Sequence, residues 1–143
     1  MKLRTLILPA ALAVVAAVCL AAGEAKKEFA LPMGDVEQGK AAFQALRCYA
    51  CHRVEGADFP APVATPPVPV VLGGKVKQMP SRLDLANSII NPSHEFAPGY
   101  KDELIKSGKL SRMGDYSDVL TVRQLSDLVA FLQSRYTVEG GSR

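Results

Sequence analysis

The sequence predicts an all-α domain of about three to five helices. Apolar residues recur at spacings of three and four in several segments, which is the pattern of helices with one buried face. Residues that favour helix starts precede several of these segments, and no strand pattern surrounds the main cysteine motif. The 143 residues suffice for one domain and are too few for two. We place the domain at residues 35–137, with a flexible segment at 24–34 and a tail at 138–143.

The first and last helices of this domain are the most clearly marked. Asp35 is a suitable N-cap for a helix that runs to about Arg47. Thr121 and Gln124 match a capping box, and the helix that they begin should end near residues 135–136. The predicted apolar faces consist of Val36, Gly39, Phe43 and Leu46 in the first helix and Val122, Leu125, Leu128, Val129 and Leu132 in the last.

The middle of the chain is predicted to hold shorter elements. A helix is expected from Ser81 to Asn91, because Pro92 disfavours helical backbone in the residue before it. A short helical piece is expected at 101–105. Residues 56–74 carry five prolines among apolar residues, so we expect extended backbone that wraps an apolar object there. The face predicted to be buried in the 81–91 helix consists of Leu83, Ala86, Asn87 and Ile90.

The N-terminus has the outline of a signal peptide. Lys2 and Arg4 precede an uncharged apolar run at 6–22, and small residues follow it. We therefore predict that residues 1–23 are a signal peptide, cleaved within 22–25, and that the protein is periplasmic. A retained membrane anchor is the alternative, because 17 apolar residues lie at the lower limit for crossing a bilayer.

The charge of the exported chain argues against one class of partner. The formal net charge of +3 falls to +1 when Lys2 and Arg4 are removed, because residues 1–23 contain no acidic residue. A nucleic-acid-binding protein needs a clustered basic face. No nucleic-acid partner is therefore expected.

The decisive motif is the pentapeptide Cys-Tyr-Ala-Cys-His at 48–52, which fits the C-x-x-C-H signature of c-type haem attachment. Two thiols at this spacing can each form a thioether with a haem vinyl group, and the next residue then offers an imidazole to the iron. The sequence thus predicts one haem c bound covalently by Cys48 and Cys51 and ligated by His52. The remaining cysteine, Cys19, lies in the predicted signal peptide.

Two other interpretations of the cysteine pair are weaker. A thioredoxin-like redox pair also has the form C-x-x-C, but it belongs in a βαβ context, whereas this pair follows an amphipathic helix. A zinc site would need His52 and His94 together with both thiols, at an unusual spacing.

A six-coordinate haem iron needs a second axial ligand, for which Met and His are the usual residues in electron carriers. Met113 is favoured, because it lies in a Gly-containing loop ahead of the last helix, 61 residues after His52. This length allows the chain to pass around the haem. Met79 is the runner-up, followed by His94 and then Met33.

Two tyrosines are candidate haem contacts. Tyr49, inside the motif, can touch the haem edge, and Tyr100, beside a Pro-Gly turn, can donate to a propionate. An ordinary packing role is the alternative for both. A candidate docking patch for an acidic partner consists of Lys75, Lys77 and Arg82.

The chain resembles the small monohaem class I cytochromes c over about residues 35–136. Two segments carry the resemblance: Gly-Lys-Ala-Ala-Phe at 39–43, which leads into the haem motif, and Arg-Met-Gly at 112–114, followed by a Leu-Thr start to the last helix. The resemblance implies a cytochrome c-like fold wrapped around the haem, with His52 and Met113 as iron ligands. It also implies that Gly39 packs against Phe131 where the first and last helices cross. A proline carbonyl is expected to orient His52, and the candidates are Pro60, Pro62, Pro66 and Pro67.

A haem with two protein ligands has no open coordination position, so the expected function is single-electron transfer and not enzymatic turnover. The expected partners are redox proteins such as a dehydrogenase, an oxidase or a reductase, with a membrane involved only if the N-terminal segment is retained. Residues 91–100 resemble the mid-section of cytochrome domains in larger respiratory or sulfur-oxidising complexes. A fixed subunit of such a complex is therefore one alternative. A haem enzyme or gas-binding protein with an open sixth site is another.

Overall fold

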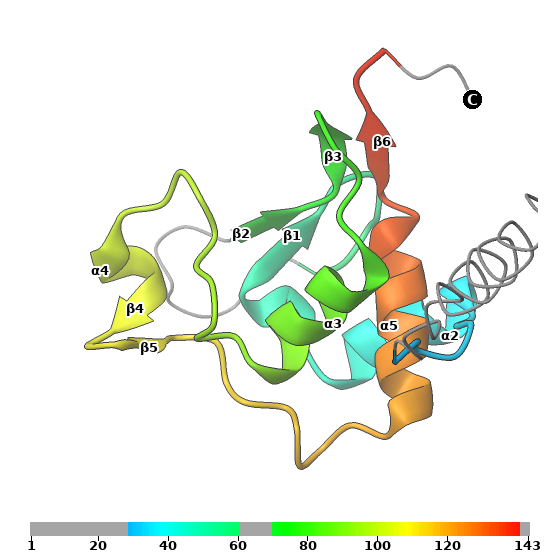
Figure 1. The fold of residues 1–143 in the computed structure, drawn as a ribbon, viewed down its shortest axis with the longest axis horizontal. Helices are drawn as coiled ribbons and strands as arrows, with labels where there is room; N and C mark the ends of the chain where they lie inside the picture. The colour runs from blue at the N-terminus through cyan, green and yellow to red at the C-terminus, as the bar shows by residue number, and fades with distance from the viewer. Residues whose placement is uncertain (1–28, 61–69, 141–143) are drawn as a thin grey trace, which may run out of the picture.

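The computed structural model describes residues 29–60 and 70–140 of the chain. The predicted signal peptide, its cleavage site and residues 61–69 of the proline-rich segment lie outside these residues. Four α-helices dominate the described part: α2 (Val36–Ala45), α3 (Arg82–Ile90), α4 (Asp102–Ile105) and α5 (Val122–Gln133). Figure 1 shows α2 and α3 packed against α5, with α4 set apart from them.

Short strands accompany the helices, so the prediction of an all-α domain holds only roughly. β1 (His52–Val54) pairs in parallel with β2 (Val70–Leu72), and β3 (Gly74–Val76) pairs in parallel with β6 (Tyr136–Val138). β4 (Lys106–Ser107) and β5 (Leu110–Ser111) form a small antiparallel hairpin. Each sheet has two strands of at most three residues, which is too short for a readable alternation of apolar and polar residues.

The crossing of α2 and α5 forms the centre of the fold. Gly39 lies so close to α5 that a Cβ atom there would be 1.9 Å from the carbonyl oxygen of Asp127 and 2.7 Å from Cβ of Phe131. The predicted packing of Gly39 against Phe131 is thereby confirmed. The carboxylate of Asp127 accepts a hydrogen bond from the backbone N–H of Asp35 at 2.8 Å, which ties the start of α2 to the same part of α5.

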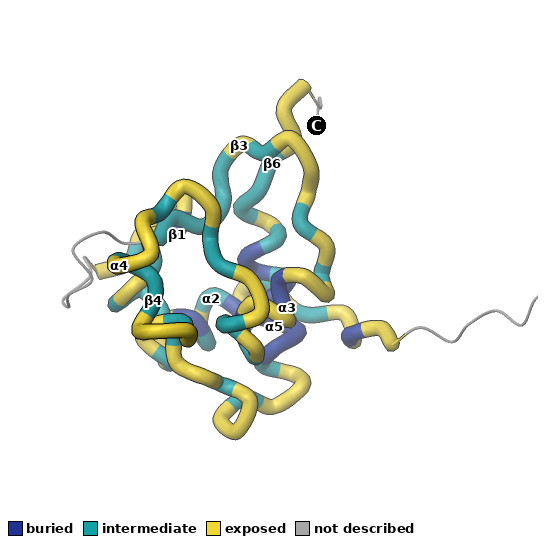
Figure 2. The backbone as a smooth tube through the Cα atoms, turned by 60° about the vertical axis from the view of Figure 1, so that its left-hand side comes forward, coloured by how far each residue is buried: buried dark blue, intermediate teal, exposed yellow. Residues whose placement is uncertain are grey.

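The hydrophobic core lies where α2, α3 and α5 meet, and these helices carry most of the buried residues in Figure 2. Phe43 and Phe131 are almost completely buried, and their rings lie 5.7 Å apart. Phe59 packs against both rings, at 4.9 and 6.0 Å. Val54 extends the core into β1, beside the haem motif. The remaining core members are Leu31, Leu85, Ala86, Ile89, Leu125, Leu128, Val129 and Leu132.

The predicted starts of the three longer helices are confirmed. Asp35, Ser81 and Thr121 each accept a hydrogen bond from a backbone N–H of the first turn. Ser81 and Thr121 complete capping boxes, with Asp84 and Gln124 as the reciprocal side chains. α5 ends at Gln133, slightly earlier than predicted, because the chain then extends into β6.

The buried face of α3 differs from the prediction. Leu85, Ala86 and Ile89 are buried, whereas Leu83 is 39% exposed and Asn87 faces solvent. The predicted face and the observed face both contain Ala86 and both follow helical spacing, so periodicity alone does not choose between them. Packing against α5 makes the choice.

The described part of the segment before α2, residues 29–34, is held against the domain. Leu31 is buried in the core. The Arg82 guanidinium donates to the carbonyls of Leu31 and Pro32, and Arg123 donates to the carbonyl of Met33 at 3.0 Å. At the other end, Glu139 donates its N–H to Val76, so the fold continues beyond the predicted boundary at 137. Within the described ranges, no helix has the length and apolar character needed to span a bilayer.

Candidate haem site

A largely apolar cavity of about 310 Å³ opens between the helices, the β1–β2 pair and the β4–β5 hairpin. This volume lies in the range of cofactor pockets, about 300–1,000 Å³. Its apolar lining comes from all four helices, from β2 and β6 and from connecting loops, and only a few polar side chains are added. The apolar and aromatic lining consists of Phe43, Leu46, Val70, Leu72, Leu85, Ile89, Pro92, Phe96, Ala97, Pro98, Leu104, Ile105, Tyr116, Leu120, Leu128, Leu132 and Tyr136.

The haem motif forms one edge of this cavity. Residues Cys48–Ala50 make a single 3₁₀ turn, closed by a hydrogen bond from the Cys51 N–H to the Cys48 carbonyl at 3.1 Å. Arg47, in the left-handed region with φ of 57°, turns the chain out of α2 into the motif. The turn places Cys48, Cys51 and His52 in the cavity lining, as covalent attachment of a cofactor there requires.

The environment of Cys48 suits a thioether better than a thiolate. Burial raises the pKa of the Cys48 thiol to about 11, and the neighbouring Cys51 contributes in the same direction. A thiolate, which is the form that ligates metals, is therefore disfavoured at this position. The two thiols are not joined in a disulfide.

The imidazole of His52 is oriented by the backbone of β2. Its Nδ1 lies 3.3 Å from the carbonyl oxygen of Val70, the residue paired with His52 in the β1–β2 register. Donation from Nδ1–H leaves Nε2 as the free lone pair, the arrangement typical of a metal-bound histidine. Burial lowers the pKa of His52, which favours the neutral form that binds a metal.

The carbonyl that orients His52 corrects a sequence expectation. The acceptor is Val70, not Pro60; the other candidates, Pro62, Pro66 and Pro67, lie outside the described residues. The parallel pairing of β2 with β1 selects the acceptor, and this pairing brings together residues 18 positions apart. The amino-acid composition of the proline-rich segment gives no information about which residues pair between the two strands.

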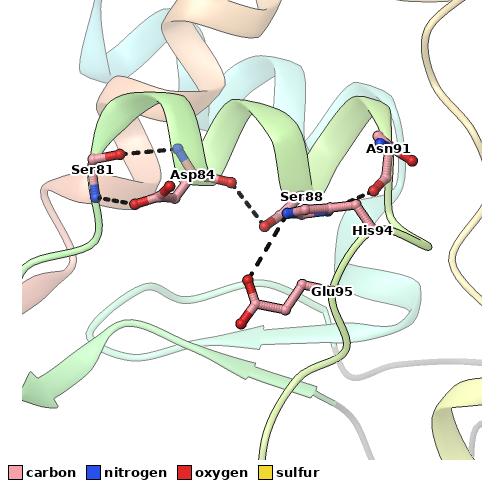
Figure 3. A network of polar contacts seen from close by, with 6 residues as sticks. All are labelled: Ser81, Asp84, Ser88, Asn91, His94 and Glu95. Carbon is pink, nitrogen blue, oxygen red and sulfur yellow. Dashed lines mark hydrogen bonds and ion pairs between the residues drawn. The ribbon is translucent and has the colours of Figure 1, made fainter.

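Four residues were candidates for the second axial ligand, and all four are described. Met113 alone lines the cavity that contains His52. Met79 is 36% exposed and Met33 is 78% exposed, with the Met33 sulfur beside the Arg82 guanidinium. His94 lies beyond the end of α3, where its Nδ1 is 2.7 Å from the Asn91 carbonyl (Figure 3).

The two candidate tyrosines lie outside the cavity lining. The Tyr49 ring stacks on Phe59, with centroids 6.4 Å apart and planes 6° apart. The Tyr100 hydroxyl accepts a hydrogen bond from the backbone N–H of Val71 at 3.0 Å. A contact of either residue with haem stays a prediction.

The structure adds cavity residues that sequence reasoning did not single out. Tyr116 lines the cavity three residues after Met113. Its pKa is raised by burial and, to a smaller degree, by Cys48 and Cys51, which line the same cavity. The sequence feature that could have indicated Tyr116 is its position in the same loop as Met113.

The family comparison agrees with this geometry. The family model for cytochrome c matches residues 36–135, which is most of the chain. The chain belongs to the cytochrome c family. No curated protein and no solved structure gave a significant match.

Membership of the cytochrome c family fixes the cofactor as covalently bound haem c, with Cys48 and Cys51 at the attachment spacing. The thioredoxin interpretation is therefore wrong. The zinc interpretation has no structural support, because His94 lies outside the cavity lining and residues 29–60 and 70–140 contain no group of three or more potential metal ligands.

The residues around the cavity fit a haem. When bound, haem supplies one-electron exchange between Fe(II) and Fe(III). Cys48 and Cys51 hold it covalently, and His52 presents its imidazole in a fixed tautomer. The apolar lining lowers the local dielectric, which is one of the factors that set the reduction potential of a haem. This cytochrome c therefore transfers electrons through its haem.

Proposed function

We propose that this cytochrome c is a periplasmic electron carrier that shuttles single electrons between redox proteins, with His52 and Met113 as the axial ligands of its iron. The observation that carries the proposal is that Met113 and His52 line one cavity, whereas Met33, Met79 and His94 do not. Two strong protein ligands leave no position for substrate. A thioether ligand also raises the reduction potential relative to bis-histidine ligation.

The loop that contains Met113 is well anchored, which supports a role as ligand. The Met113 N–H donates to the Ser111 hydroxyl at 3.1 Å, and the Arg112 N–H donates to the Ile105 carbonyl at 2.9 Å. Downstream, the capping box of Thr121 and the packing of α5 hold the other end of the loop. A ligand on a loop held at both ends loses little conformational entropy when it binds.

Absorption spectroscopy of the purified protein tests the ligation. The reduced and oxidised proteins should both be low-spin, and carbon monoxide should bind weakly, because the sixth position is taken. The oxidised protein should also show the charge-transfer band of a methionine sulfur bound to Fe(III). Rapid, stoichiometric carbon monoxide binding would instead favour the haem enzyme or gas-binding alternative.

Cell fractionation and native gels test the location and the carrier role. A free carrier should appear in the periplasmic fraction, migrate as a single small species and exchange electrons with more than one redox protein. Stable co-migration with a larger complex would instead indicate the fixed-subunit alternative. Recovery in the membrane fraction with Met1 retained would favour an N-terminal anchor.

A further inference from the structure

The connection between α3 and α4, residues 91–101, accepts hydrogen bonds both from the segment before Met113 and from β2. It leaves α3 at Asn91 and turns beside His94 and Glu95 (Figure 3). Several of its residues line the cavity, but Ser93 and Tyr100 do not. Instead, each of these two uses its hydroxyl oxygen to hold a backbone segment that carries or supports a proposed iron ligand.

Ser93 is linked to the backbone of Met113 by hydrogen bonds through Ser111. Its hydroxyl oxygen accepts a hydrogen bond from the Ser111 N–H at 3.0 Å, over a separation of 18 residues. The Ser111 hydroxyl in turn accepts from the Met113 N–H at 3.1 Å. The hydroxyls of Ser93 and Ser111 therefore link residues 91–101 to the backbone of Met113.

Tyr100 acts toward His52 through a single peptide group. The carbonyl of Val70 faces Nδ1 of His52, and the N–H of Val71 donates to the Tyr100 hydroxyl oxygen at 3.0 Å. This C=O and this N–H belong to the same peptide unit, and they point in opposite directions because the peptide is trans. The hydrogen bonds thus form a chain from the imidazole, through the peptide, to Tyr100.

Such a chain has an electronic consequence. Hydrogen bonds in series polarise one another, so an acceptor on the N–H makes the carbonyl of the same peptide a stronger acceptor. A stronger acceptor at Nδ1 raises the basicity of the imidazole as a metal ligand. A more basic ligand stabilises Fe(III) relative to Fe(II), and it therefore lowers the reduction potential.

We propose that Ser93 and Tyr100 are positioning residues for the two axial ligands, with Ser93 acting on Met113 and Tyr100 acting on His52. The Ser93 part rests on the proposed ligation by Met113. The Tyr100 part requires only His52, which lies within the haem motif. The same short connection thereby links the environments of both ligands.

The test uses the holoprotein with Ser93→Ala, Ser93→Thr and Tyr100→Phe, and with Ser107→Ala as the matched control. Ser107 is exposed in β4 of the adjacent hairpin. Ser93→Ala should raise the affinity for carbon monoxide roughly two- to tenfold, the range given by the loss of one hydrogen bond. Ser93→Thr, which keeps the hydroxyl, should restore wild-type affinity. Tyr100→Phe should raise the reduction potential while the methionine-to-iron band stays unchanged.

Two results separate failure of this proposal from failure of the proposed ligation. If Met113→Ala leaves carbon monoxide affinity unchanged, Met113 is not the ligand and the Ser93 part is overturned with it. If Met113→Ala opens the site but Ser93→Ala or Tyr100→Phe behaves like Ser107→Ala, the positioning proposal itself is overturned. Amide exchange in the wild-type holoprotein gives a test that needs no variant. The Val71 N–H should be protected, and rapid exchange there would overturn the Tyr100 part.

Discussion

Gly39 lies directly against the backbone of Asp127 where α2 crosses α5, at a distance that leaves no room for a side chain. The obstructing atoms belong to the helix backbone and cannot rotate away. Gly39→Ala should therefore force the helices apart and lower the free energy of unfolding by about 1–3 kcal/mol. Denaturant unfolding of the holoprotein measures this. Gln38→Ala, on the exposed neighbour, is the control and should change stability by less than about 0.5 kcal/mol; equal effects of the two variants would contradict the packing.

Removal of both attachment cysteines tests covalent haem binding. The purified protein should carry the mass of one haem that acidified acetone does not extract. Cys48→Ala with Cys51→Ala should abolish stable holoprotein, because neither thioether can then form. Cys51 is exposed, so an unmodified thiol there would react readily. Detection of two reactive thiols in the wild-type holoprotein would rule out attachment.

Replacement of Met113 tests the axial ligand. Met113→Ala should produce high-spin character, carbon monoxide binding and a lower reduction potential, because the thioether ligand that raises the potential is lost. Met79→Ala is the matched control, since Met79 lies outside the cavity lining and should leave the spectrum unchanged. The opposite pattern would assign the ligand to Met79 and leave the electron-transfer role intact.

Arg82 should control how firmly the segment before α2 is held. Arg82→Ala removes the donor to the carbonyls of Leu31 and Pro32, so amide exchange in residues 30–34 should become faster. The loss in stability should be about 1 kcal/mol, because the contacts are partly exposed. Arg53→Ala, which breaks an exposed 3.7 Å ion pair with Glu55, is the control. Unchanged amide exchange in Arg82→Ala would show that burial of Leu31 is enough to hold the segment against the domain.

Asp84 should make part of the stability dependent on pH. Hydrogen bonds from the side chain and the backbone N–H of Ser81 lower the pKa of the Asp84 carboxyl below 3.8 in the folded protein. A lowered pKa stabilises the fold above the unfolded value, and this contribution is lost as pH falls through the folded value. Asp84→Asn should therefore be less stable than wild type at neutral pH, and the difference should shrink below about pH 4.

Thermal unfolding from pH 7 to pH 3 measures the effect of Asp84→Asn. Asp58→Asn, at an exposed position outside any helix cap, is the control and should show a smaller dependence on pH. A difference between wild type and Asp84→Asn that stays constant with pH would mean that the charge of Asp84 does not contribute to the cap.

The features that the sequence predicted correctly are local ones. Helix starts at Asp35, Ser81 and Thr121 depend on side chains within one turn, so they can be recognised without the fold. The haem motif is equally local, because one 3₁₀ turn brings its cysteines together. Gly39 and Phe131, 92 positions apart, were paired through the family resemblance and not through any local pattern.

The features that the sequence did not predict depend on long-range register. Val70 was missed as the acceptor for His52 because β1 and β2 are only three residues long. The buried face of α3 was misassigned because Leu83 and Leu85 are both apolar, and only the position of α5 decides which is covered. The hydrogen bond from the Val71 N–H to the Tyr100 hydroxyl was also missed, because it joins residues 29 positions apart.

The pairing of the first helix with the last has a consequence for how the chain folds. Asp35 and Asp127 are joined by a hydrogen bond across 92 residues, and α2 finds its main packing surface on α5. Contacts between such distant segments carry a large loop-closure cost and slow folding relative to helical bundles with local contacts. The apolar face of α2 therefore stays uncovered until α5 is available to pack against it. A truncation before α5 should leave a chain without stable tertiary structure.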